Sequence, residues 1–134
     1  PPWLLTAFRE VGVHEVPGPA AEPRIQQYAA TTTLAAVSDE VPWCSSFVNW
    51  CFTANNIPGT RSAAARSWLT WGLPALAQLG AVAVFRRGTP GQGHVGFFVH
   101  AVGNQLVILG GNQHDEVRLA TFPEARLLGY RWPA

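Results

Sequence analysis

A cysteine and a histidine carry the most reactive side chains in this sequence, and each stands at the expected start of a secondary-structure element. Cys44 follows Pro42 and precedes a run of apolar residues, a pattern that predicts a buried helix beginning near Pro42. In the first turn of a helix, free backbone N–H groups and the positive end of the helix dipole favour the thiolate. The segment therefore predicts a nucleophilic thiol, although a cysteine that only packs in the core explains it equally well.

His94 is the candidate base that such a thiol requires. The segment from His94 to His100 alternates with a period of two, which predicts a strand after a glycine-rich loop. His94 and Gly96 share one face of that strand, and Gly96 leaves space for a helix that carries Cys44. A lone histidine at a strand end is more often a surface residue, so the catalytic interpretation depends on the pair.

A side-chain amide on the following strand completes the pattern. The Gly-Asn turn at 103–104 leads into a third strand, and ideal pairing across a two-residue turn places His94 opposite Gln113. A longer turn, or a bulge at 110–111, shifts the partner to Asn112. Either amide accepts a hydrogen bond from one ring nitrogen and holds the other toward a thiol.

The rest of the chain predicts the elements that must hold these groups. Period-two patterns occupy the second half, at 81–85, 94–100, 106–109, 117–120 and 127–132. Helical patterns occupy the first half: residues 3–11 with Leu4, Phe8 and Val11 on one face, a segment opened by Pro23, the helix of Cys44, and residues 63–69 capped by Ser62. Helices followed by an antiparallel meander indicate an α+β fold with the catalytic helix packed on the sheet.

Length and composition narrow the class of protein. With 134 residues, 48% of them hydrophobic, residues 1–134 are expected to form a single domain with an ordinary core. No apolar run reaches the roughly 20 residues of a membrane helix. A net charge of +1 with 13% charged residues excludes a strongly basic nucleic-acid surface, although Arg86-Arg87 tolerates an anionic substrate. Neither a membrane nor a nucleic acid is an expected partner.

Zinc binding is the competing chemistry for the cysteines and histidines. The Cys-x6-Cys and His-x5-His spacings match none of the usual zinc patterns, so we expect no metal. Cys44 and Cys51 lie about 10 Å apart along one helix, too far for a disulfide, and both thiols are expected to be free. His100 and His114 are interpreted as structural or surface residues. The loop residues 14 and 15 are expected to be solvated, or to contact substrate if their loop flanks a cleft.

Four motifs together resemble the NlpC-type and CHAP cysteine peptidases and amidases. They are Pro-Trp-Cys-Ser-Ser-Phe-Val at 42–48, Ala-Arg-Ser-Trp at 65–68, Gly-His-Val-Gly-Phe at 93–97 and Leu-Gly-Gly-Asn-Gln at 109–113. The resemblance implies a papain-like α+β fold and cleavage of amide bonds in bacterial peptidoglycan, with no cofactor. It assigns Cys44 as nucleophile, His94 as base and Asn112 as third member.

The same resemblance gives the expected setting. We predict substrate contacts from Trp43, Ser45, Trp71 and Gln113, with a monomer acting on peptidoglycan in the bacterial periplasm or cell wall. No signal-peptide pattern opens the sequence, so we expect another export route or a leader outside the sequence given. A phage lysin, a delivered antibacterial toxin and a housekeeping hydrolase all fit, and a toxin implies a cognate inhibitor (immunity) protein.

Two other functions use the same fold. An acyltransferase or deamidase runs the same thioester chemistry on another substrate, and no residue excludes it. A wall-binding module without catalysis needs neither the thiol nor the imidazole. The occurrence of cysteine, histidine and amide in register argues against that module.

Overall fold

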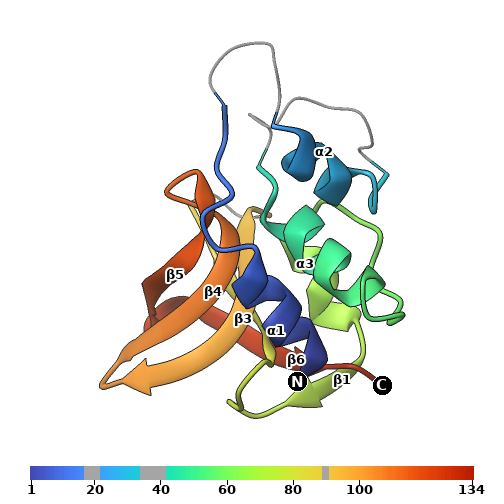
Figure 1. Ribbon diagram of the computed structural model, residues 1–134. Coiled ribbons are helices and arrows are strands. Elements are labelled where there is room, and N and C mark those ends of the chain that lie inside the picture. The colour runs from blue at the N-terminus through green and yellow to red at the C-terminus, as the bar shows by residue number, and fades with distance from the viewer. Residues whose placement is uncertain (17–21, 34–41, 89–90) are drawn as a thin grey trace.

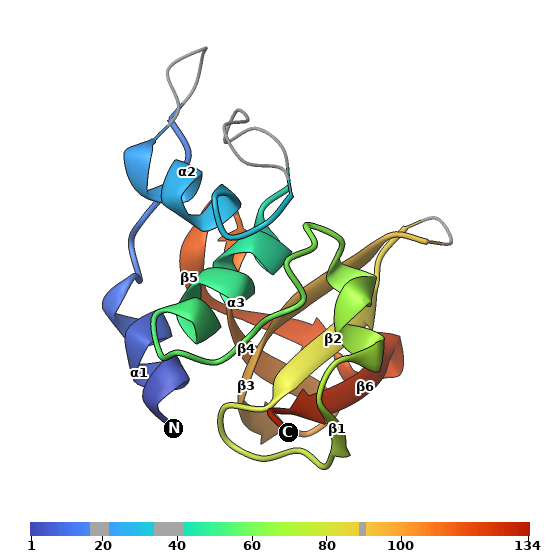
Figure 2. The same ribbon diagram turned by 90° about the vertical axis from the view of Figure 1, so that its right-hand side faces the viewer.

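The computed structural model of the protein describes residues 1–16, 22–33, 42–88 and 91–134. The α-helices of the described residues lie together on one side of the sheet (Figures 1 and 2). They are Pro2–Arg9 (α1), Pro23–Ala29 (α2) and Cys44–Thr53 (α3), and 3-10 helices occur at Ala65–Thr70 (η1) and Glu124–Arg126 (η2). Within the described residues, no helix is long and apolar enough to cross a membrane. Most of the connection expected at 30–40 lies outside the described residues.

Six strands of the described chain form one antiparallel sheet in the order β1-β6-β2-β3-β4-β5. Their bounds are Leu73–Ala75 (β1), Val82–Arg86 (β2), Gly93–Val102 (β3), Gln105–Gln113 (β4), Glu116–Pro123 (β5) and Leu127–Trp132 (β6). Strands β2 to β5 make the predicted meander, but β6 pairs with β2 and not with β5. The sheet curls strongly, so the chain leaving β5 through η2 reaches the free edge of β2 (Figure 2).

The curled sheet buries apolar side chains on both of its faces. One core lies between the sheet and the helices and includes Tyr28, Phe47, Phe52, Trp68 and Phe97. The other lies inside the curl and includes Ala83, Phe85, Phe98 and Ile108. Because neighbouring residues of a strand point to opposite faces, β2 and β3 supply side chains to both cores. This explains why their sequences are apolar almost without interruption.

The buried face of α1 differs from the predicted one. Trp3 and Leu4 are buried, whereas Phe8 and Val11, both expected to face the core, are 40% and 49% exposed. The indole N–H of Trp3 donates to the carbonyl of Gly80 at 2.8 Å, which fixes the side of the helix that faces the sheet. Periodicity within α1 did not reveal this contact because Gly80 lies far along the chain.

Residues 62–72 also differ in detail from expectation. The helix predicted at 63–69 is a 3-10 helix, and the residue at its N-terminal cap is Ala64. The hydroxyl of Ser62 instead accepts the N–H of Ala64 at 3.1 Å, within the preceding turn. Gly72 has φ +60°, a conformation that favours glycine, and leads into the edge strand β1.

Candidate active site

Cys44 is the first residue of α3 and follows Trp43 at the N-terminal cap. Most of the helix is buried, as its apolar sequence predicted, and Cys44 itself is only 4% exposed. The first N–H groups of a helix have no partner within it. The backbone N–H groups of Ser45 and Val95 face the Cys44 thiol and contribute to lowering its pKa. The start of α3 therefore gives a thiolate polar contacts inside an otherwise apolar core.

His94 reaches this place from the sheet. It is the second residue of β3, pairs with Phe85 of β2 and is 2% exposed. Its ring stacks on Phe122 of β5, with ring centroids 4.8 Å apart and an interplanar angle of 19°. Packing against an aromatic side chain thus restricts the plane of the imidazole before any polar contact acts on it.

Gln113, the last residue of β4, restricts rotation of the His94 ring by a hydrogen bond. Its Oε1 lies 2.8 Å from Nε2 of His94. Its own Nε2 donates to the carbonyls of Ile108 at 3.1 Å and Arg118 at 2.7 Å, which identifies the amide oxygen as the atom facing the ring. An amide oxygen only accepts, so Nε2 of His94 must carry a hydrogen and donate it. The unprotonated position of the neutral ring is therefore Nδ1.

Nδ1 of His94 is the nitrogen left for the thiol. It is buried and has no complete hydrogen bond to any described residue. The ring nevertheless acts on Cys44. Burial raises the pKa of the Cys44 thiol, but the charge of His94, a hydrogen-bonding contact with its ring and the N–H groups of Val95 and Ser45 together lower that pKa below its ordinary value. Contacts of this kind are commonly long in unliganded sites and tighten when substrate binds.

The β3–β4 hairpin contains two irregularities that set which amide reaches His94. The turn at 103–104 is the predicted two-residue turn, since Val102 pairs with Gln105. The register with β4 then shifts between residues 98 and 100 of β3, and the register with β5 shifts between residues 110 and 113 of β4. The second shift confirms the bulge predicted at 110–111. The first shift, at residues 98–100, involves no glycine or proline from which it could have been predicted.

Asn112 lies inside the second irregularity and does not occupy the position beside the ring. Its φ is +56°, so the backbone turns there and the alternation of side chains is broken. Gln113 follows it and is 4% exposed against His94. The structure therefore corrects the placement of Asn112 expected from the family resemblance, and the hydrogen-bond partner of His94 is Gln113.

Glycines make room for these contacts. A Cβ atom at Gly110 would lie 2.5 Å from Oε1 of Gln113, and one at Gly111 would lie 2.6 Å from the Trp43 ring. The close approach predicted at 110–111 is confirmed. Gly96 differs from expectation, because a Cβ there would meet Ile108 at 2.5 Å and not the helix of Cys44.

A comparison with protein-family models finds the CHAP domain over residues 36–112, which spans both Cys44 and His94. The chain belongs to the CHAP family. Its few helices and antiparallel sheet form the α+β fold consistent with a CHAP domain, and CHAP domains are typically hydrolases that act on peptidoglycan. Gln113 lies one residue beyond the matched segment. No significant match was found among curated proteins.

Two of the residues predicted to contact substrate are buried in this CHAP domain. The indole N–H of Trp43 donates to Glu15 at 2.7 Å, and its ring stacks on Tyr28. Glu15 was expected to be solvated, but this bond ties its loop to the start of α3. The hydroxyl of Ser45 donates to the Ser62 carbonyl at 2.7 Å and accepts from the indole N–H of Trp68 at 2.9 Å. Both side chains therefore support the site from within the core.

Trp71 lies apart from the Cys44–His94 pair. Its indole N–H donates to the carbonyl of Pro58 at 3.0 Å, and its ring packs on Phe52 and Trp68. These contacts belong to the core behind α3. Of the four predicted substrate contacts, only Gln113 touches a member of the pair, and it does so as a partner of His94.

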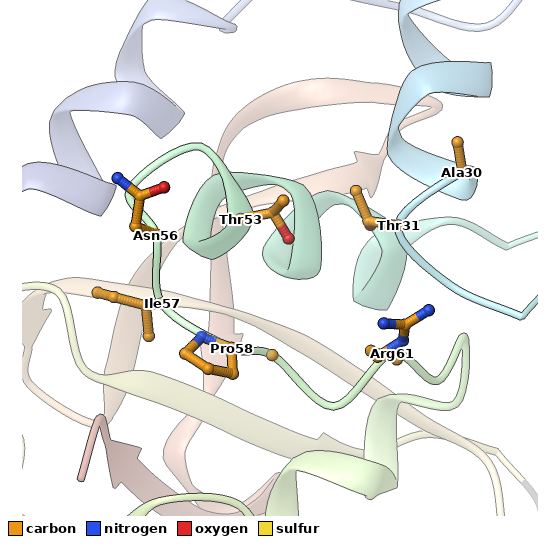
Figure 3. A pocket seen from close by; sticks show the side chains of 8 residues that line it. Ala30, Thr31, Thr53, Asn56, Ile57, Pro58 and Arg61 are labelled. Atoms are coloured by element: carbon orange, nitrogen blue, oxygen red, sulfur yellow. The ribbon is translucent and has the colours of Figure 1, made fainter.

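Of two cavities lined by described residues, one adjoins His94. A cavity of about 380 Å³ is lined by His94, Gln113 and a group of arginines. The larger one, of about 520 Å³, lies at the opposite end of α3, beside Thr53 and Arg61 (Figure 3). Because neither Cys44 nor His94 lines the larger cavity, its size does not make it the active site.

The second cysteine and the histidines at 100 and 114 are not members of the Cys44–His94 pair. Both cysteines are free thiols, as predicted. Burial and the charge of Glu10 raise the pKa of Cys51 well above its ordinary value, so this second thiol is unreactive. His100 and His114 are exposed. Across the described ranges, no three histidine, cysteine or acidic side chains cluster to hold a metal ion.

Proposed function

We propose that this CHAP domain hydrolyses amide bonds in bacterial peptidoglycan, with Cys44 as nucleophile, His94 as acid and base, and Gln113 as the positioning residue. One observation carries the proposal: a cysteine at a helix start, with its pKa lowered, beside a buried histidine whose far nitrogen is held by an amide. Packing of a cysteine in the core does not require such a histidine beside it. The arrangement supports thiolate catalysis.

In the first half of the reaction, the Cys44 sulfur attacks the carbonyl carbon of the amide and forms a tetrahedral oxyanion. The C–N bond then breaks. Nδ1 of His94 gives its proton to the leaving nitrogen, which departs as an amine and leaves a thioester on the enzyme. Backbone N–H groups at the start of α3 are the nearest donors for the oxyanion, and loss of one such donor costs about 10²–10³ in rate in comparable enzymes.

In the second half, Nδ1 of His94 takes a proton from water as the water oxygen attacks the thioester carbon. The C–S bond breaks, a carboxylic acid leaves, and the thiolate and imidazolium are restored. Gln113 keeps the proton on Nε2 throughout, so the same ring nitrogen serves both halves. The cycle consumes one water and needs no cofactor.

The test is digestion of purified peptidoglycan fragments by the native protein and by Cys44→Ala and His94→Ala variants. We expect new amines and carboxylates from the native protein and from a Cys51→Ala control, which removes the unreactive thiol of the same helix. Mass spectrometry of the products identifies the bond and separates an amidase from an endopeptidase. Equal product from all four proteins would overturn the proposal.

We also propose that the site of action is the bacterial periplasm or cell wall, because the substrate lies there. If the protein serves as a toxin against other bacteria, a cognate inhibitor should cover the surface over His94. The digestion above, repeated with an added amine acceptor, separates hydrolysis from acyl transfer. A product joined to the acceptor in preference to water would favour an acyltransferase.

A further inference from the structure

Three arginines surround the mouth of the cavity beside His94. Arg86 ends β2, Arg87 follows it, and Arg126 ends η2, so the group comes from two separate parts of the chain. All three are exposed, whereas His94 and Gln113, which also line the cavity, are buried. The cavity therefore has a positively charged rim above the polar floor of the proposed catalytic site.

The positive charge at this mouth is uncompensated. None of the described residues that line the cavity is acidic, and Glu124, two residues before Arg126, does not line it. Within the described chain, ion pairs join Arg24 to Glu10 and Arg118 to Glu116, and none involves the rim arginines. The chain has only nine cationic residues and a net charge of +1. Three of these nine residues lie at one opening, so the positive charge there is local and does not reflect a strongly basic protein.

The position of the cavity relates it to one half of the substrate. His94 and Gln113 line it, whereas Cys44 does not, so the cavity lies beyond the His94 ring as seen from the Cys44 sulfur. In the proposed reaction His94 gives a proton to the leaving nitrogen, and the part of the substrate attached to that nitrogen must lie over the histidine. A group that enters the cavity is therefore carried by the leaving amine.

We infer that the cavity is a subsite for a carboxylate on the amine side of the bond that is cut. Arginine binds carboxylates with parallel N–H donors, and a cavity of about 380 Å³ accommodates one amino-acid residue. The substrates are then amides whose leaving amine belongs to an amino acid or short peptide with a free carboxylate nearby. This inference rests on the proposed function, because it uses the role of His94 to orient the substrate.

The test compares two substrates that differ only in one group of the leaving half, a free carboxylate or the corresponding carboxamide. Exposed ion pairs contribute modestly, so we expect kcat/KM for the carboxylate to exceed that for the carboxamide by about ten-fold, mainly through KM. In the triple variant Arg86→Gln/Arg87→Gln/Arg126→Gln the ratio should fall toward one. Arg9→Gln, which removes an exposed arginine outside the cavity, should leave the ratio unchanged.

Binding measurements keep this test separate from the test of catalysis. In a Cys44→Ala background, calorimetric titration with a dipeptide that has a free C-terminal carboxylate should show binding that its C-terminal amide lacks. Equal binding of the two peptides, or a ratio of kcat/KM unaffected by the triple variant, would overturn the carboxylate subsite even if hydrolysis is confirmed. Carboxylate binding without any hydrolysis would keep the anion site and overturn the proposed function.

Discussion

Replacing Gln113 with alanine should reduce catalysis as well as folding stability, because its side chain makes three buried hydrogen bonds, one of them to His94. The variant removes the oxygen 2.8 Å from Nε2 of His94 and leaves a buried ring N–H without an acceptor. An unsatisfied buried donor costs about 1–3 kcal/mol. If the ring must be held in place for the reaction, that loss corresponds to roughly a 5- to 150-fold lower kcat/KM.

The control for this prediction is the neighbouring amide. Asn112→Gly suits a residue with φ +56°, since glycine adopts that conformation without strain. It should change kcat/KM by only about two-fold, because Asn112 lines the cavity beside His94 but is not the hydrogen-bond partner of the ring. Amine release gives kcat/KM, the rate of Cys44 alkylation reports the thiolate directly, and thermal melting shows whether each variant is folded.

Gln113→Glu adds a diagnostic comparison. A carboxylate retains an acceptor for His94 but cannot donate to the two carbonyls that hold the amide. We expect the pH profile of kcat/KM to move while Asn112→Gly leaves it in place. A full-rate Gln113→Ala variant, or an Asn112→Gly variant as damaged as Gln113→Ala, would refute the assignment of the positioning residue.

Three further predictions follow from the same contacts. Cys44, with a lowered pKa, should react with iodoacetamide at pH values well below the ordinary thiol pKa of about 8.5, and Cys51, with a raised pKa, should stay unreactive above it; equal rates would contradict the pKa directions. Gly110→Ala places a Cβ atom 2.5 Å from the Gln113 oxygen, and because that end of the side chain can move, activity should fall while the melting temperature changes little. Tyr28→Phe removes a 2.7 Å hydrogen bond to the buried carboxylate of Glu10, the C-terminal cap of α1. It should cost about 1.5–3 kcal/mol of unfolding free energy, measured by denaturant titration, without changing the alkylation rate.

Local patterns in the sequence predicted the parts of the site that depend on one segment at a time. Pro42 and the apolar run after Cys44 placed the start of α3 to within two residues. The alternation after Gly93 placed His94 at the beginning of a strand. Both signals are carried by adjacent residues, and no distant contact is needed to interpret them.

The parts that failed depend on contacts between distant segments. Ideal pairing across the two-residue turn predicted Gln113, whereas the bulge at 110–111 alone predicted Asn112. Gln113 is the partner because a further register shift near Val99 offsets the bulge, and that shift has no sequence signal. Trp43 was expected to contact the substrate, but its indole N–H donates to Glu15 in a loop 28 positions earlier. The pairing of β6 with β2 likewise depends on the curl of the whole sheet.

The nucleophile and its base belong to different layers of the molecule. Cys44 belongs to the helical layer, whereas His94 and Gln113 belong to the sheet, and the backbone of Gly111 lies directly against Trp43 where the layers meet. Layers that separate locally need less free energy than complete unfolding. We therefore expect heating to abolish activity below the melting temperature. At that point the two layers have separated enough to part Cys44 from His94, while spectroscopic signals still show intact secondary structure.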